Sequence, residues 1–268
     1  MLSDRDLAIF SQNGVVTVPG ALSLDDMAII GQTIDALPQN EGTVLESHGN
    51  AVRGRHGDHL YSSTLSDLTR LAIFRRTAEA IFNESVYVYQ FKINMKSAFC
   101  GEAWPWHNDY VFWDQEDGLR RPDAVTFGLF LTEVNEFNGP MHFIPGSHIE
   151  KYDAREGASA DRAADGSEDL NSFVGANLKY TIAPRQITRL ARDNGMAAAQ
   201  GPIGTILLFH SRTAHCSPPN LSPYPRNILF ITYCPVTNVA TRSTRPHFLV
   251  SRDATALQPL AREQLLLH

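Results

Sequence analysis

The chain has 268 residues, of which 43% are hydrophobic and 19% are charged, so it is long enough to bury a sizeable core. Its formal net charge of −6 argues against a nucleic-acid partner, because binding phosphates requires a basic surface. No stretch approaches the roughly 20 apolar residues that cross a bilayer, and the N-terminus lacks the apolar core of a signal peptide. Three cysteines without CxxC spacing suggest neither a zinc knuckle nor a disulfide framework. We expect a cytoplasmic protein with no membrane partner.

The N-terminal third is predicted to be mostly helical. Helix-capping serines and apolar periodicity predict a helix over residues 3–12, a strand over 14–20, and helices over 23–37 and 66–82. Between the last two helices, residues 39–57 are rich in Gly, Asn, Ser, His and Arg, which is typical of a loop. The side chains of Arg53, Arg55 and His56 could contact a substrate, but a solvated loop explains the composition better.

Residues 86–96 alternate between two kinds of side chain and form the clearest strand in the sequence. The period of two predicts one face with Val86, Val88, Gln90, Lys92, Asn94 and Lys96, and an opposite face with Tyr87, Tyr89, Phe91, Ile93 and Met95. A polar row of this kind either lines a cavity or faces solvent, and alternation alone does not separate the two.

Further strands follow in the second half of the chain. The almost wholly apolar residues 124–132 predict a central strand covered on both faces, and residues 138–148 predict a turn, a short strand and another turn. The polar residues 150–200 are an insertion, either a lid over the substrate or a disordered segment, with a short helix over 187–196. Residues 201–209 and 226–233 return to strand.

The chemistry of the sequence centres on His107-Asn108-Asp109, within residues 104–113. On an extended strand, His107 and Asp109 would project to the same face and hold one cation between them. An isolated HxD is more often a structural histidine beside a solvated aspartate. The surrounding aromatic residues, however, supply a dry wall: Trp104, Trp106, Tyr110, Phe112 and Trp113.

A third metal ligand must come from elsewhere in the chain. His215 is the best candidate, His210 is an alternative that spacing leaves open, and His142 and His148 are weaker rivals by residue type. Arg226 follows as a basic anchor. Histidine, carboxylate, distant histidine and arginine, in this order, are what a non-haem iron(II) site using 2-oxoglutarate requires: three ligands, open positions for the chelating oxo-acid, and a cation for its far carboxylate.

These motifs resemble the phytanoyl-CoA dioxygenase-like family of iron(II)/2-oxoglutarate oxygenases. Within it, the sequence is most similar to the stand-alone free-amino-acid hydroxylases that oxidise leucine, and to ectoine hydroxylase. The resemblance covers most of the chain from about residue 86. It is carried by residues 89–96, 106–110 with Trp113, 116–118, 132–139, 145–148, 209–210 with His215, 222–226, 245–248 and 251–253.

The resemblance implies a fold that is mainly β with flanking helices: a double-stranded β-helix, or cupin-like jelly-roll. We expect a single domain over residues 1–268. Its parts are a helical N-terminal part (1–85), a jelly-roll core (86–149 and 201–250), and the insertion (150–200) as a candidate lid.

The resemblance also implies roles for individual residues. His107, Asp109 and His215 become the Fe(II) ligands, and His215 is favoured over His210. The cosubstrate 2-oxoglutarate is expected at Arg226, Asn94, Thr126, Ser217 and Gln90. The substrate is expected at Trp113, Phe112 and Arg245, with Arg245 binding a substrate carboxylate.

The expected reaction uses Fe(II), 2-oxoglutarate and O2 to hydroxylate an aliphatic C–H bond of a small substrate, most consistent with a free leucine-like L-amino acid, releasing succinate and CO2. Asn108 stands where ectoine hydroxylases typically have serine, which makes ectoine the second choice; an N-acyl- or carrier-linked amino acid is a further alternative. Asp109 favours hydroxylation over halogenation, because halogenases of the superfamily lack the acidic ligand. A 2-oxoglutarate-binding sensor without turnover and a zinc hydrolase are the rivals. The oligomeric state, monomer or homodimer, is left open.

Overall fold

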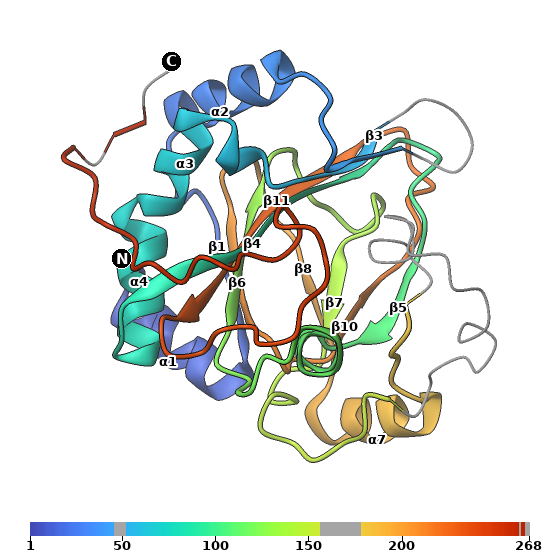
Figure 1. Cartoon of the computed structure of the whole chain (residues 1–268). Coiled ribbons are helices and arrows are strands. Elements are labelled where there is room, and N and C mark those ends of the chain that lie inside the picture. The colour runs from blue at the N-terminus through green and yellow to red at the C-terminus, as the bar shows by residue number, and fades with distance from the viewer. Residues whose placement is uncertain (46–51, 156–177, 263, 266–268) are drawn as a thin grey trace.

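Two antiparallel sheets face each other in the computed structural model, which describes residues 1–45, 52–155, 178–262 and 264–265 (Figure 1). In spatial order the larger sheet contains β1 (Val15–Val18), β9 (Ile206–His210), β6 (Val125–Phe130), β11 (Arg226–Pro235), β4 (Val86–Lys96), β3 (Val52–His56) and β2 (Thr43–Leu45). The smaller contains β5 (Trp104–His107), β10 (His215–Ser217), β7 (Met141–Phe143) and β8 (Ala197–Ala199). This confirms the predicted mainly-β jelly-roll with flanking helices.

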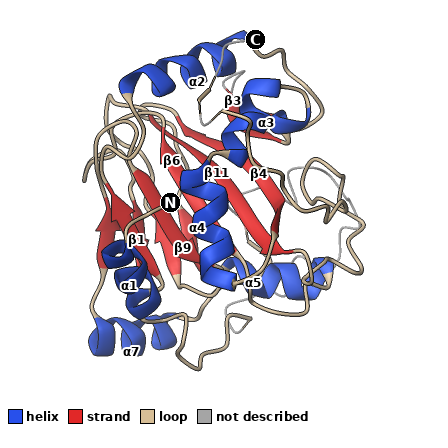
Figure 2. Ribbon diagram, turned by 90° about the vertical axis from the view of Figure 1, so that its left-hand side faces the viewer, coloured by secondary structure: helices blue, strands red, loops and turns tan. Residues whose placement is uncertain are grey.

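Helices cover the outer face of the larger sheet, where α4 and α1 lie across its strands (Figure 2). They are α1 (Asp4–Asn13), α2 (Leu24–Ala36), α3 (Ser63–Arg70) and α4 (Ala72–Phe82), with the short η1 (Asp58–Leu60) before α3. Ser3 and Ser23 cap α1 and α2 as expected. The helix predicted over 66–82 is instead two helices, because Leu71 adopts an extended ψ of 138° between them. None of the helices in these segments has the length and apolar character needed to cross a bilayer.

A β-bulge in β4 decides which side chains enter the space between the sheets. Thr232 pairs with Gln90 and Tyr233 pairs with Val88, so Tyr89 has no partner opposite it. Beyond the bulge the alternation changes sides. Val88 packs in the core beneath the helices, whereas Gln90 lines the internal cavity. The prediction of one face for the whole strand is therefore wrong at Val86 and Val88, and its polar row does line a cavity.

The loop predicted over residues 39–57 holds for residues 39–42 but is wrong for two strands. Thr43–Leu45 and Val52–His56 form a hairpin that extends the larger sheet, with Gly54 opposite Asn94. The charge of Arg55 is buried because Asp58 pairs with it at 2.7 Å. Residues 46–51 lie outside the described residues.

The remaining predictions fall on the central strand and the insertion. All of β6 is buried in the middle of the larger sheet, as expected. Within the insertion, α7 (Pro184–Asn194) starts three residues before the predicted helix, because Pro184 suits the first helical turn. Residues 156–177, the middle part of the predicted lid, lie outside the described residues.

Candidate active site

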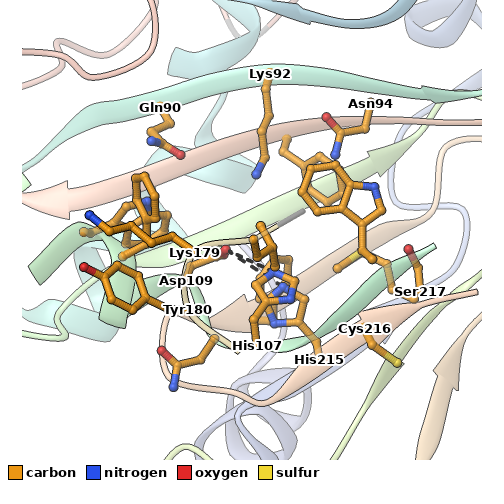
Figure 3. Close-up of a pocket in the computed structure, with 18 of the residues that line it drawn as sticks. Gln90, Lys92, Asn94, His107, Asp109, Lys179, Tyr180, His215, Cys216 and Ser217 are labelled. Atoms are coloured by element: carbon orange, nitrogen blue, oxygen red, sulfur yellow. Dashed lines mark ion pairs between the residues drawn. The ribbon is translucent and has the colours of Figure 1, made fainter. Parts of the chain in front are cut away.

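His107, Asp109 and His215 converge in the cavity, with Tyr180 on one side of them and Ser217 on the other (Figure 3). His107 ends β5 and lies opposite His215 at the start of β10. Asp109 Oδ1 is 3.8 Å from His107 Nε2 and 3.9 Å from His215 Nε2. The expectation that Asp109 shares the strand of His107 is wrong, since α5 (Asp109–Phe112) begins at that residue. Asn108 caps this helix by accepting a hydrogen bond from the Val111 N–H at 3.0 Å, which turns the Asp109 carboxylate back toward the histidines.

The protonation states of this cluster suit a divalent cation. Nδ1 of His107 faces the Pro105 carbonyl at 2.7 Å and Nδ1 of His215 faces the Thr213 carbonyl at 2.9 Å, so each ring donates from Nδ1 and presents Nε2 to Asp109. Burial lowers the pKa of both rings, to about 3 for His107. Burial acts to raise the pKa of Asp109, but His215, Lys92 and His107 hold it below its usual value. Two neutral imidazoles and a carboxylate form a facial donor set for iron(II).

The rival histidines lie outside this cluster. His210 accepts a hydrogen bond at Nδ1 from the Arg212 N–H at 3.1 Å, so that nitrogen is already used by the protein backbone. The His148 ring lies 5.5 Å from the His210 ring, and His142 is partly exposed on β7. Among the described residues, the group that could hold a metal contains His215 and none of these three.

A cluster of positive charge lies at one end of the cavity. Arg226 is 2% exposed, its Nε has no hydrogen-bond partner in the described structure, and burial lowers its pKa to about 10. Lys96 lies opposite Arg226 in the sheet and donates to Ser217 Oγ at 2.9 Å. Because an ammonium group only donates, Ser217 must accept this bond, and its own hydroxyl hydrogen is free to point at another acceptor. This end of the cavity is suited to an anion.

Of the other residues predicted to bind 2-oxoglutarate, three line the cavity and one does not. Asn94, Gln90 and Ser217 line the cavity with Arg226. Thr126 is buried on β6, where its hydroxyl forms a 2.9 Å hydrogen bond with that of Thr232, and it is not one of the lining residues. Its role in binding cosubstrate stays a prediction.

A second arginine lines the cavity in a different environment. Arg245 donates from Nε to Asp117 Oδ1 at 2.9 Å and from Nη2 to the other carboxylate oxygen. Its guanidinium carbon is 4.9 Å from the centre of the Phe112 ring. Trp113, 3% exposed, also lines this part of the cavity. The three residues predicted to bind substrate are therefore brought together.

Several lining residues were not among the site residues that the sequence analysis selected. Lys92 lies between Gln90 and Asn94 on β4 and points toward the triad (Figure 3). His56 enters from β3, and burial lowers its pKa to about 3, so it is neutral at physiological pH. Lys179 and Tyr180 come from the insertion, where both bind Glu116 Oε1, at 2.7 and 2.6 Å. Alternation placed Lys92 on the correct face, whereas no sequence signal marked the insertion residues.

Comparison with known proteins places this geometry in a family. The profile described as phytanoyl-CoA dioxygenase (PhyH) matches residues 10–228. The chain belongs to this family. It is 39% identical over 261 residues to the L-proline trans-4-hydroxylase of Streptomyces griseoviridis, covering 96% of this chain and 95% of that protein. It is 28% identical over 264 residues to the ectoine dioxygenase of Nocardia farcinica, covering 94% and 86%.

Two solved structures of a similar protein share the fold, one with bound Fe and the other with 2-oxoglutarate. EctD from S. alaskensis with bound Fe superposes with a TM-score of 0.81 at 26% identity, covering 97% of this chain and 87% of that one. EctD with 2-oxoglutarate and 5-hydroxyectoine superposes with a TM-score of 0.77, covering 95% and 86%. As a member of this family, the chain is an Fe(II)/2-oxoglutarate-dependent dioxygenase that uses O2 and acts on a small-molecule substrate.

Proposed function

We propose that this enzyme hydroxylates an unactivated C–H bond of a free small amino acid, with L-proline as the first candidate. The observation that carries the proposal is the presence of two buried arginines in one cavity with the His-Asp-His cluster. A carboxylate on the cosubstrate would supply a partner for Arg226, and a carboxylate on the substrate would meet the N–H groups that Arg245 leaves unused beside Asp117. The 39% identity to an L-proline trans-4-hydroxylase supports the choice of amino acid.

In this proposal His107, Asp109 and His215 would hold iron(II) through two imidazole nitrogens and one carboxylate oxygen. When bound, iron(II) and 2-oxoglutarate together activate O2 to oxidise a C–H bond, with release of succinate and CO2. Arg226 binds the distal carboxylate of 2-oxoglutarate, with the Ser217 hydroxyl and the Asn94 amide lining the same space. Among the described residues no carboxylate pairs with the buried Arg226 guanidinium, which favours a carboxylate ligand.

The substrate carboxylate binds Arg245 in this proposal, and Phe112 and Trp113 contact its aliphatic part. These rings form an apolar wall against which a pyrrolidine ring or a branched side chain packs without exposing carbon to water. Gln90 lines the same cavity, and in this proposal its amide oxygen accepts a hydrogen bond from the substrate nitrogen. L-Leucine is the alternative amino acid, because the sequence motifs resemble those of hydroxylases that oxidise leucine.

The test is succinate release by enzyme loaded anaerobically with iron(II) and 2-oxoglutarate and then exposed to air. The panel contains L-proline, L-leucine, other free L-amino acids and ectoine, with mass spectrometry for the gain of one oxygen. Turnover of a free amino acid supports the proposal. Turnover of ectoine alone, or 2-oxoglutarate binding without succinate for any compound, contradicts it and favours an ectoine hydroxylase or a sensor.

The metal assignment is tested with Asp109→Ala, which we expect to abolish hydroxylation, because two histidines alone hold iron(II) weakly. Asp114→Ala is the matched control: it removes a carboxylate from the same helical segment that lies outside the metal cluster. Full activity in Asp109→Ala would remove the assignment.

A further inference from the structure

Asp117 is a fully buried carboxylate whose hydrogen-bonding capacity is filled. Its side chain is 0% exposed and accepts from Arg245 Nε at 2.9 Å, from Arg245 Nη2, from Tyr89 Oη at 2.6 Å and from Ser243 Oγ at 2.8 Å. A carboxylate has about four lone-pair positions, and these four bonds use them. Asp117 is therefore held in one orientation and holds Arg245 in one orientation in turn.

The way in which Asp117 binds Arg245 leaves a defined edge of the guanidinium unused. A guanidinium has five N–H groups in a rigid plane. Asp117 takes one from Nε and one from Nη2, which form one edge, and the parallel N–H groups of Nη1 and Nη2 form the next edge. In the described part of the chain no protein acceptor bonds to this second edge, and Arg245 lines the cavity. The Phe112 ring, 4.9 Å from the guanidinium carbon, further limits its movement.

Asp117 is also tied to the metal site by the chain itself. It is the last residue of η2 (Trp113–Asp117), which follows directly from α5, and α5 begins with the metal-cluster residue Asp109. One continuous helical segment thus carries a cluster carboxylate at its first residue and the partner of Arg245 at its last. This segment therefore connects the metal cluster to the carboxylate that binds Arg245.

We propose that Asp117 is a positioning residue that aims the free edge of Arg245 at the substrate carboxylate and so determines which carbon is hydroxylated. This inference rests on the proposed function, since it assumes a substrate with a carboxylate. Asp117 itself does not touch the substrate. Its effect is on the orientation of Arg245, and therefore on selection for an α-carboxylate and on the position of the new hydroxyl group.

The test compares Asp117→Asn with the wild type on the amino acid identified by the panel and on its carboxamide. Asparagine keeps one acceptor but turns an NH2 group toward the donors around it, so Arg245 loses its fixed orientation. We expect the KM for the amino acid to rise about tenfold or more, and the KM for the carboxamide to change little. The single hydroxylated product should become a mixture of regioisomers. The KM for 2-oxoglutarate should stay the same.

Asp114→Asn is the matched control, because it makes the same substitution three residues earlier without touching Arg245. Tyr89→Phe is a second, milder variant that removes one of the hydrogen bonds to Asp117 and keeps the ring. Like Asp117→Asn, this variant should reduce the preference for the amino acid over its carboxamide and increase the share of the second regioisomer. If Asp117→Asn does not fold, the result for Tyr89→Phe tests the inference.

The outcomes separate this inference from the proposed function. If the wild type turns over no free amino acid, the proposed function fails, and the inference fails with it. If the wild type does turn one over, but the variants keep the wild-type acid-to-amide ratio and a single product, only the inference is overturned. A purely structural role for Asp117 predicts that second result, with lower stability as the sole change.

Discussion

The two arginines of the cavity are buried to a similar degree but differ in their partners. Arg226, 2% exposed, has no carboxylate partner in the described structure, and its Nε is unsatisfied. Arg245, 5% exposed, is held by Asp117 through two hydrogen bonds. A buried charge without a partner favours binding an anion, because the anion supplies the missing compensation. A charge that is already compensated binds an anion less strongly but in a fixed direction. Arg226 is therefore suited to bind the cosubstrate, which takes part in every turnover. Arg245 is suited to orient the substrate.

The largest expected effect is an opposite response of stability to removal of the two arginines. Arg245→Met leaves the Asp117 carboxylate buried without a cation, which should lower the free energy of unfolding by about 3–5 kcal/mol. Arg226→Met removes a buried charge that has no partner, so the free energy of unfolding should be unchanged or rise by about 1 kcal/mol. Urea unfolding without iron or 2-oxoglutarate measures both. Equal losses in the two variants would mean that the contrast between the arginines is false.

Next in size is the effect of Arg226 on cosubstrate affinity. Arg226→Met should weaken 2-oxoglutarate binding by about 100-fold, because the distal carboxylate loses its charged partner in a buried site. Binding of 2-oxovalerate, which has the same chain length without that carboxylate, should hardly change. Anaerobic calorimetry with iron(II) present measures both ligands, and Arg242→Met, at an exposed arginine, is the control. A similar loss for both ligands would place the distal carboxylate elsewhere.

A smaller effect is expected from Lys96, which orients the Ser217 hydroxyl at the same end. Lys96→Met should weaken 2-oxoglutarate binding by about tenfold, since Ser217 is no longer obliged to direct its hydrogen at the ligand. Ser217→Ala should cost a similar amount, and the double variant should cost less than the sum of the two, because both changes remove one hydrogen bond. The same calorimetric titrations measure the coupling. Strictly additive losses would show that Lys96 acts independently of Ser217.

The smallest effect concerns His210, the histidine that competed with His215 in the sequence. Burial lowers its pKa to about 3, from an ordinary value of 6.5. Between these pH values the unfolded chain binds a proton that the folded protein does not, so the free energy of unfolding falls as the pH drops from about 6.5 to about 3. His210→Gln, whose amide oxygen can still accept from Arg212, should make this fall shallower in urea titrations at several pH values. Parallel curves for variant and wild type would contradict the assigned neutral state.

Much of the fold could be predicted because local pattern and tertiary position agree. The alternation in residues 86–96 identified β4, and serine caps identified the starts of α1 and α2. The bulge at Tyr89 could not be predicted, because it depends on the partner strand β11 rather than on the sequence of β4. The hairpin of β2 and β3 was missed for a related reason. Its polar residues become compatible with a sheet only when Asp58 neutralises Arg55.

The structure brings His107, Asp109 and His215 together as the sequence predicted, although Asp109 reaches the cluster from a helix start rather than from a strand. Their roles as iron ligands stay a prediction. Residues 116–118 carry part of the resemblance, but the role proposed for Asp117 could not be predicted, because its partners Tyr89, Ser243 and Arg245 lie at least 28 residues from it in the chain. Thr126 and the single-domain organisation stay predictions.

The helical segment from Asp109 to Asp117 has a consequence for how enzymes of this kind diversify. Insertion or deletion of one residue within it would rotate Asp117 around the helix axis relative to Asp109 and disturb both sites at once. The residues proposed to bind the cosubstrate lie on β4, β10 and β11, outside this segment. A new substrate preference is therefore more accessible to evolution by substitution of side chains that line the cavity than by a change in the number of residues between Asp109 and Asp117.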